Sequence, residues 1–325
     1  MTDLRTDFTF RTAALPQDGD AMAALVGDYF RAYAGRMVEP PENVVAEIAS
    51  SAKTSRGSQT TLAYGPDGEL AGFLWWEVGS RKDAPNWWDV YVHPRHAGPL
   101  EVELVSRADA AARRWLDGHD PGRLRVESGT LRENTSLAEA LQAAGLGHER
   151  TFWQMARALT DDVAVPPPPP AGIVVRVVPD DAQGRALLHR IMETAFRDHW
   201  NHPERSYEEF WQRKESHPGM DPSQWWVADL DGVPAGACMG DTSRAAAGIG
   251  HVQTLGVLRE GRGRGIGQLL LRTAFAAQYA RGWTRCELGV DADNPTGATR
   301  LYRNVGMEPV QVFDLYTKEL DRTPG

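Results

Sequence analysis

The sequence predicts an α/β protein of the α+β type in which one domain occurs twice in tandem. Two observations favour this fold class: strand-like and helix-like segments alternate along all 325 residues, and the same series of segments appears in both halves. A third is the run of five prolines at residues 166–170, because such a run continues neither a sheet nor a helix and favours a stiff spacer. The length also fits about two domains of ordinary size. We therefore expect a first domain at residues 1–165, a linker at 166–172 and a second domain at 173–325.

The segments of the two halves follow the same order. In the first half, a strand precedes an acidic turn and an apolar helix, two strands then flank a Gly-Pro-Asp-Gly turn, and a further strand ends at a proline. These segments are residues 8–11, 21–33, 61–64, 72–75 and 89–94. The second half repeats them, with a Leu-Asp-Gly turn, at residues 173–176, 182–196, 226–229, 236–238 and 251–257. The tryptophans of the first half are interpreted as core or interface residues rather than a ligand platform: Trp75, Trp76, Trp87 and Trp88.

A glycine-rich loop follows the last of these strands and precedes a helix expected at residues 268–281. It consists of Arg262, Gly263, Arg264, Gly265, Ile266 and Gly267. Glycines let a backbone approach an anion closely, the first N–H groups of a helix have no intrahelical partner, and the helix dipole adds about half a positive charge. Arg262 adds a cation with a fork of donors. The loop therefore predicts a pyrophosphate site, with an ordinary flexible turn as the alternative.

A second motif lies at a fixed distance after this loop. A strand at residues 286–290 is broken at residues 291–295, and a short helix at 296–304 ends before Gly306. Together the two motifs resemble the GNAT acyltransferase superfamily over about residues 173–320, through Arg262, Gly265, Gly267, Asn294, Leu301, Tyr302 and Gly306. A tandem arrangement with one altered and one intact copy is similar to the mycothiol synthase branch of that superfamily, although it does not specify the acceptor.

The resemblance implies that each copy is a mixed, mostly antiparallel twisted sheet flanked by helices. It implies that the loop holds the pyrophosphate of acyl-CoA and that pantetheine lies between splayed strands, bound by the backbone of Leu255, Gly256 and Val257. Tyr302 would then protonate the CoA sulfur, since an ordinary tyrosine pKa of about 10 makes it a usable acid. Asn294 would cap the tyrosine helix and contact the pantetheine arm.

The general base is the residue that the sequence defines least. Glu287 on the strand after the loop is preferred, acting directly or through a water molecule. The alternatives are a neutral incoming amine that needs no base, or one of His251, Glu193, Asp198 and His199. The aromatic residues that follow are interpreted as the core-facing side of a helix, with a pocket for a cationic acceptor as the alternative: Tyr207, Phe210 and Trp211.

The first copy differs where the second has its phosphate loop. Ala97 and Leu100 take the places of Arg262 and Gly265, and Pro99 removes a backbone donor. Glu101 would also face any bound phosphate, and no tyrosine occupies the place of Tyr302. We therefore expect a degenerate first copy that binds no CoA and supports the second.

The amino-acid composition of the chain argues against some classes of binding partner. With 42% hydrophobic and 24% charged residues and a formal net charge of −9, the chain fits an ordinary globular protein without a surface for nucleic acid or anionic membrane. No run is long enough to span a membrane and the N-terminus does not open a signal peptide, so a cytoplasmic location is expected. Cys238 and Cys286 lack a metal-ligand spacing and are expected to be buried thiols, and the histidines indicate no metal site.

These observations predict an N-acyltransferase of the EC 2.3.1 class. Acetyl-CoA is the expected donor and an amine of a small molecule or peptide the expected acceptor. Two alternatives stay open: a donor bound to a carrier protein, and a non-catalytic module that senses acyl-CoA. The duplication is compatible with a monomer that acts as a pseudo-dimer, or with a homodimer.

Overall fold

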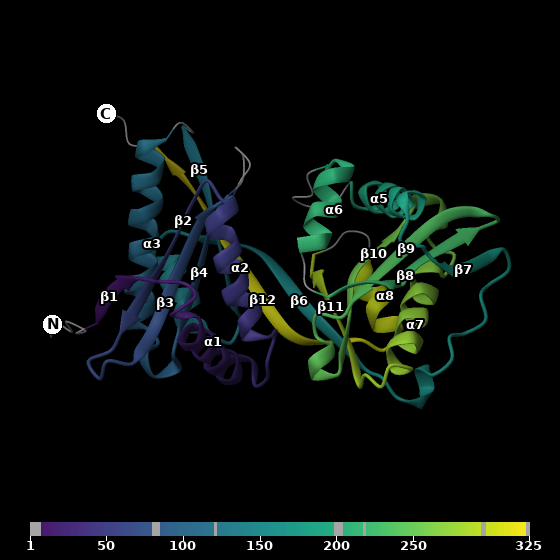
Figure 1. Cartoon of the computed structure of the whole chain (residues 1–325), viewed down its shortest axis with the longest axis horizontal. Coiled ribbons are helices and arrows are strands. Elements are labelled where there is room, and N and C mark those ends of the chain that lie inside the picture. Colours follow the sequence, from purple (N-terminus) through teal and green to yellow (C-terminus); the bar gives the residue numbers. More distant parts are fainter. Residues whose placement is uncertain are drawn as a thin grey trace. The chain divides into compact units, whose positions relative to one another are not determined.

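The computed structural model describes residues 8–79, 85–119, 122–197, 204–216, 219–293 and 297–322. The chain forms two compact units (Figure 1). Unit 1 contains Met1–Phe152 together with Gln311–Gly325, and unit 2 contains Trp153–Val310. Each unit is a mixed, mostly antiparallel sheet with helices against it, which confirms the predicted fold class.

Unit 1 has its strands in the order β1-β2-β3-β4-β5-β12. Only β4 and β5 pair in parallel among the pairings described in this unit. Its elements are β1 (Thr9–Thr12), α1 (Gly19–Ala34), α2 (Pro41–Thr54), β2 (Gly57–Tyr64), β3 (Leu70–Val78), β4 (Asn86–Val92), α3 (Pro99–Gly118), β5 (Arg123–Leu131) and α4 (Thr135–Ala143). Helix α2 was not predicted from the sequence, because its side chains are mostly small or polar and few of them are buried. Trp75, Trp76 and Trp88 are buried, as predicted.

Unit 2 repeats this arrangement in the order β6-β11-β10-β9-β8-β7. Its elements are β6 (Gly147–Ala158, from Trp153 onward in this unit), β7 (Ile173–Val177), α5 (Ala182–Phe196), α6 (Tyr207–Ser216), β8 (Met220–Leu230), β9 (Val233–Asp241), β10 (Ile249–Val257), α7 (Ile266–Tyr279), β11 (Arg285–Asp291) and α8 (Ala298–Asn304). The bounds of α5 are those predicted from its apolar periodicity. Helix α7 begins two residues earlier than predicted, directly after Gly265.

The units differ from the two sequence halves by their last strands. Strand β12 (Glu308–Asp321) follows α8, yet it pairs antiparallel with β5 of unit 1, from Phe313 opposite Leu131 to Asp321 opposite Arg123 (Figure 1). Strand β6 precedes the prolines, yet it is the neighbour of β11 in the strand order. The proline run at residues 166–170 accordingly lies within unit 2 rather than between the units.

Two apolar layers cover the two faces of the unit 2 sheet. One layer lies under α7 and α8 and includes Cys238, Cys286 and Leu288; the other lies under α5 and α6 and includes Ala237 and Met239. Both cysteines are fully buried free thiols, as predicted. Alternation along each strand therefore places the odd-numbered residues of β9 and β11 on the α5/α6 face. Among the described residues, no helix is long and apolar enough to cross a membrane.

Candidate active site

The sheet of unit 2 opens between β10 and β11. These strands pair in parallel at only three positions, Ile249 with Arg285, Gly250 with Cys286 and His251 with Glu287. Both strands continue beyond the last of these pairs, to Val257 and Asp291. Beyond His251, the backbone N–H and C=O groups of β10 that face β11 therefore do not pair with β11.

The backbone groups that face this opening follow from the pairing of β10 with β9. The N–H of Leu258 donates to the carbonyl of Ala235, so hydrogen bonds to β9 alternate at Thr254, Gly256 and Leu258. Leu255 and Val257 then direct their N–H and C=O groups away from β9. Consistent with this direction, Arg262 Nε donates to the carbonyl of Val257 at 3.3 Å. Two of the three residues predicted to bind pantetheine thus present backbone groups to the opening.

The third residue of that set, Gly256, has a packing role. A Cβ at this position would lie 2.9 Å from Ala195 Cβ and 3.2 Å from Met192 Sδ, so glycine lets α5 approach β10 closely. Its backbone bonds to β9 rather than facing the opening.

The predicted phosphate loop lies at the same end of β10 and leads into α7. Gly263 and Gly265 have φ values of 75° and 81°, a region that favours glycine. Arg262, Gly263, Arg264 and Gly265 are exposed, and a Cβ on Gly263 would meet no atom within 4 Å. The first hydrogen bond of α7 runs from the Leu269 N–H to the Gly265 carbonyl, so the preceding N–H groups point out of the helix end toward the loop.

Ile266 and Gly267 anchor this helix end. Ile266 is fully buried in the α7 layer. A Cβ on Gly267 would lie 2.9 Å from Leu301 Cδ2, so this glycine lets α7 pack against α8. The loop therefore combines an exposed tip of positive charge with a rigid base.

Tyr302 is buried in the same layer, on α8. Burial raises its pKa well above the ordinary value, and the nearby Cys238 thiol adds to the shift. Cys238 is the register partner of Leu255, so the tyrosine ring lies near the strand segment that flanks the opening. The phenol is therefore protonated at neutral pH, as a proton donor must be.

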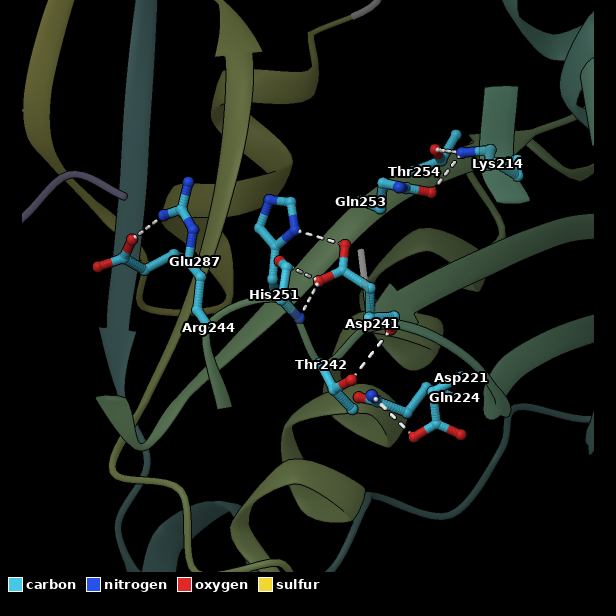
Figure 2. Close-up of polar contacts among 12 residues, drawn as sticks. Lys214, Asp221, Gln224, Asp241, Thr242, Arg244, His251, Gln253, Thr254 and Glu287 are labelled. Carbon is cyan, nitrogen blue, oxygen red and sulfur yellow. Dashed lines mark hydrogen bonds and ion pairs between the residues drawn. The ribbon is translucent and has the colours of Figure 1, made fainter. Parts of the chain in front are cut away.

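A row of polar side chains crosses the other face of the sheet, on neighbouring strands (Figure 2). His251 Nδ1 lies 2.8 Å from Asp241 Oδ2, and both side chains are largely buried. Asp241 Oδ1 accepts hydrogen bonds from the backbone N–H and the hydroxyl of Ser243. Because the carboxylate fixes the proton on Nδ1, Nε2 of the imidazole is the acceptor nitrogen.

Glu287 lies beside His251 in register and is fully buried. Arg244 Nη1 donates to its Oε2 at 2.5 Å, and Arg285 Nε lies 2.8 Å from its Oε1. Gln154 of β6 donates a further hydrogen bond to Oε2 at 3.2 Å. The structure thus brings the preferred base candidate to the site but occupies its oxygen atoms with two guanidinium groups and an amide.

A β-bulge in β10 determines which side chains meet α6. The register with β9 shifts between Val252 and Thr254, so two consecutive residues, Gln253 and Thr254, both reach the α6 side. Lys214 Nζ of α6 donates to Gln253 Oε1 at 2.5 Å and to Thr254 Oγ1 at 2.8 Å (Figure 2). The sequence analysis singled out neither Lys214 nor Asp241. Alternation could have placed Asp241 on the face of Met239, whereas the contact of Lys214 depends on the bulge.

The remaining candidates have different positions. Glu193 accepts a hydrogen bond from the Arg205 backbone N–H at 3.0 Å, which ties α5 to the segment before α6. Phe210 and Trp211 are buried in the α5/α6 layer with Tyr207 against it, which confirms the core interpretation. Asn294, Asp198 and His199 lie outside the described residues. Among the residues that the structure describes, no group of three or more His, Cys, Asp or Glu side chains could hold a metal ion.

In unit 1, the side chain of Glu101 fills the loop that corresponds to the predicted phosphate loop of unit 2. Glu101 is fully buried, and its carboxylate accepts hydrogen bonds from the Gly98 N–H at 2.8 Å and from Asn134 Nδ2 at 3.0 Å. The Glu101 carboxylate therefore lies at the start of α3, on the loop where the sequence predicts that it would face a bound phosphate.

Comparisons with known proteins agree with this geometry. Residues 185–307 match the family model "Acetyltransferase (GNAT) family". A mycothiol acetyltransferase of Thermobispora bispora is 28% identical over 81% of this chain and 84% of its own length, and one of Saccharopolyspora erythraea is 29% identical over 81% and 86%. The crystal structure of a GCN5-related N-acetyltransferase from Sphaerobacter thermophilus superposes with a TM-score of 0.79 at 29% identity, covering 98% of this chain and 96% of that one.

A tandem GNAT protein from the clavulanic acid biosynthesis pathway shares the fold, with a TM-score of 0.69 at 16% identity over 98% of this chain and all of that one. The matched residues 185–307 of unit 2 therefore form a GNAT acetyltransferase domain, and the chain as a whole has the fold of the tandem GNAT structures. It is similar to the mycothiol acetyltransferases over most of its length. Acetyl-CoA is the co-substrate of this family.

Proposed function

We propose that unit 2 transfers an acetyl group from acetyl-CoA directly to an amine of a small molecule or peptide. The observation that carries the proposal is the opening of β10 from β11 directly beside the glycine loop at the start of α7. The opening offers an unpaired strand edge to an extended pantetheine arm, and the loop offers cations and helix N–H groups to a pyrophosphate. The intact loop favours CoA over a carrier-bound donor, which has no nucleotide.

In this proposal each part of the donor has a binding segment. Arg262 and the backbone from Gly263 to Gly267 hold the pyrophosphate, and Leu255 and Val257 bind the pantetheine amides. The N–H groups of this strand polarise the thioester carbonyl and stabilise the negative oxygen of the tetrahedral intermediate. Asn294 is the remaining proposed contact with the pantetheine arm.

The chemistry requires two proton transfers. The amine attacks the thioester carbon, the C–N bond forms and the C–S bond breaks. The amine loses one proton and the CoA thiolate gains one, which gives an amide and a free thiol. We assign the donated proton to Tyr302, whose pKa is raised by burial and whose hydroxyl is therefore protonated when the thiolate leaves.

Glu287 and His251 are the two candidates for the group that receives the amine proton. Glu287 was preferred on sequence, but two arginines and a glutamine already engage its oxygens. His251 has one nitrogen fixed by Asp241 and the other left as acceptor. We therefore propose that His251 takes the proton and that Glu287 has a structural role, holding Arg244 and Arg285 beside the site.

The direct test is release of CoA thiol from acetyl-CoA in the presence of a panel of primary amines, comparing the native chain with Tyr302→Phe. The variant should lower kcat by about two orders of magnitude, within the range for loss of a general acid, while the Kd for acetyl-CoA changes less than about twofold. Tyr279→Phe on α7, whose hydroxyl donates to Asp161, is the matched control. Acetyl-CoA binding without turnover of any amine would instead favour the non-catalytic module, and absence of binding would favour a carrier-bound donor.

A further inference from the structure

Lys214 projects from α6 onto the strand that flanks the proposed thioester position. It follows the buried Trp211 by three residues, so it lies on the side of α6 that faces the sheet. Its ammonium contacts Gln253 and Thr254, and Thr254 directly precedes Leu255, whose backbone faces the opening. Lys214 therefore contacts the residue next to the strand segment that is proposed to bind the donor.

Among the residues that the structure describes, Lys214 has no direct counter-ion, because no carboxylate lies within ion-pair distance of Nζ. An ammonium has three N–H donors, and the two hydrogen bonds described go to neutral oxygens. Burial, together with the positive charges of Arg213 and Arg205, lowers the Lys214 pKa to about 8, while the attraction of Asp241 opposes this shift. A partly buried cation of this kind is stabilised by an anion that reaches its third donor.

The proposed base lies on the same face of the sheet. His251 lies between Asp241 and Glu287 of the neighbouring strands, and its Nε2 atom is the proposed acceptor of the amine proton (Figure 2). An acceptor bound across this face could direct its amine to the imidazole and a negative group to the Lys214 ammonium.

We propose that Lys214 binds a carboxylate of the acceptor, and that the acceptor is therefore a carboxylate-bearing amine such as an amino acid or a short peptide. The proposal rests on the N-acetyl transfer proposed above. A carboxylate suits the site because the contacts of the described residues use two of the three ammonium donors, and its single charge matches that of the cation.

The kinetic test uses pairs of acceptors that differ only in the charge of one group. Each pair consists of a free amino acid (glycine, alanine or glutamate) and the same amino acid with its α-carboxylate replaced by an amide. The native enzyme should use each acid with a kcat/KM at least about tenfold above its amide, the effect of one charged hydrogen bond. Lys214→Met keeps the stem but removes the charge, so it should raise KM for the acids about tenfold and leave kcat and the amides nearly unchanged. Lys214→Arg should restore part of the preference, and Arg213→Met, an exposed neighbour on α6, should leave it intact. Equal use of acids and amides by the native enzyme, or an unchanged preference in Lys214→Met, would overturn the proposal.

A second measurement separates this proposal from the proposed reaction. Calorimetric titration of N-acetylglycine and N-acetylglycinamide into the protein saturated with CoA needs no turnover. The carboxylate should bind at least about tenfold more tightly than the amide, and Lys214→Met should abolish the difference. If this difference is found while no amine is acetylated, the reaction is wrong and the carboxylate site stands. If amines are acetylated but no difference is found in either measurement, the carboxylate site is wrong and the reaction stands.

Discussion

Replacing Glu287 by Gln should show whether its carboxylate is a structural group or the catalytic base. The side chain is fully buried, Arg244 contacts it at 2.5 Å and Arg285 at 2.8 Å. Removing one partner of a buried ion pair typically costs about 3 to 5 kcal/mol, because the remaining charge stays buried. Arg285 is about a third exposed and is partly solvated by water, whereas Arg244 is only 15% exposed. We therefore expect a loss of about 3 kcal/mol in the free energy of unfolding.

The assay is urea and thermal unfolding of the native chain and of the variant, followed by steady-state kinetics on folded protein. A loss of about 3 kcal/mol corresponds to a fall in Tm of roughly 6–12 °C for a cooperative unit of this size. Turnover of the folded variant should fall less than about tenfold. His251→Gln should instead lower kcat by about 10²-fold to 10⁴-fold.

The double variant Glu287→Gln, Arg244→Met provides the control. If the ion pair accounts for the loss, the second substitution should restore part of the stability, since it removes the unbalanced cation. The reasoning is refuted if Glu287→Gln retains its stability and loses all turnover while His251→Gln remains active, because Glu287 would then be the base.

Three further predictions follow from the loop, from Lys214 and from one close approach in the core. Calorimetry should find one acetyl-CoA site per chain, and the double variant Arg262→Ala, Gly265→Leu should weaken binding at least about tenfold, because charge-assisted bonds are lost and leucine is strained at a φ of 81°. Arg95→Ala in the corresponding loop of unit 1 is the control. A second acetyl-CoA site would contradict the prediction that the first copy is degenerate. The lowered pKa of Lys214, about 8 against 10.5 in the unfolded chain, means that the unfolded state binds more protons between these pH values. The free energy of unfolding of the native chain should therefore rise from pH 8 to 10.5 relative to Lys214→Met, and parallel pH profiles would show that the lysine is not perturbed. Gly250→Ala places a Cβ 2.2 Å from Gln278 Oε1 and should cost about 1–3 kcal/mol in chemical denaturation, whereas Gly289→Ala meets no atom within 4 Å and should be nearly neutral.

The sequence by itself determined the local features of this protein. The period of its apolar residues gave the bounds of α5, the alternation of β11 and the core-facing side of α6, because side-chain direction repeats with the backbone geometry of each element. The glycine loop with Arg262 could be recognised because its backbone conformation and its charge both depend on consecutive residues of the sequence. The altered loop of unit 1 could also be read from consecutive residues, whereas only the structure shows the Glu101 carboxylate bonded to Gly98 and Asn134.

Tertiary structure alone decided the features that depend on segments far apart in the chain. The pairing of β12 with β5 and the place of β6 beside β11 cannot be read from either strand, since an edge of hydrogen-bonding groups accepts more than one partner. The bulge in β10 turns Gln253 and Thr254 to one side and so brings them to Lys214. The partners of Glu287 and His251 likewise come from other elements, and these partners, rather than the residue types, decide which group has an oxygen or nitrogen available for a proton.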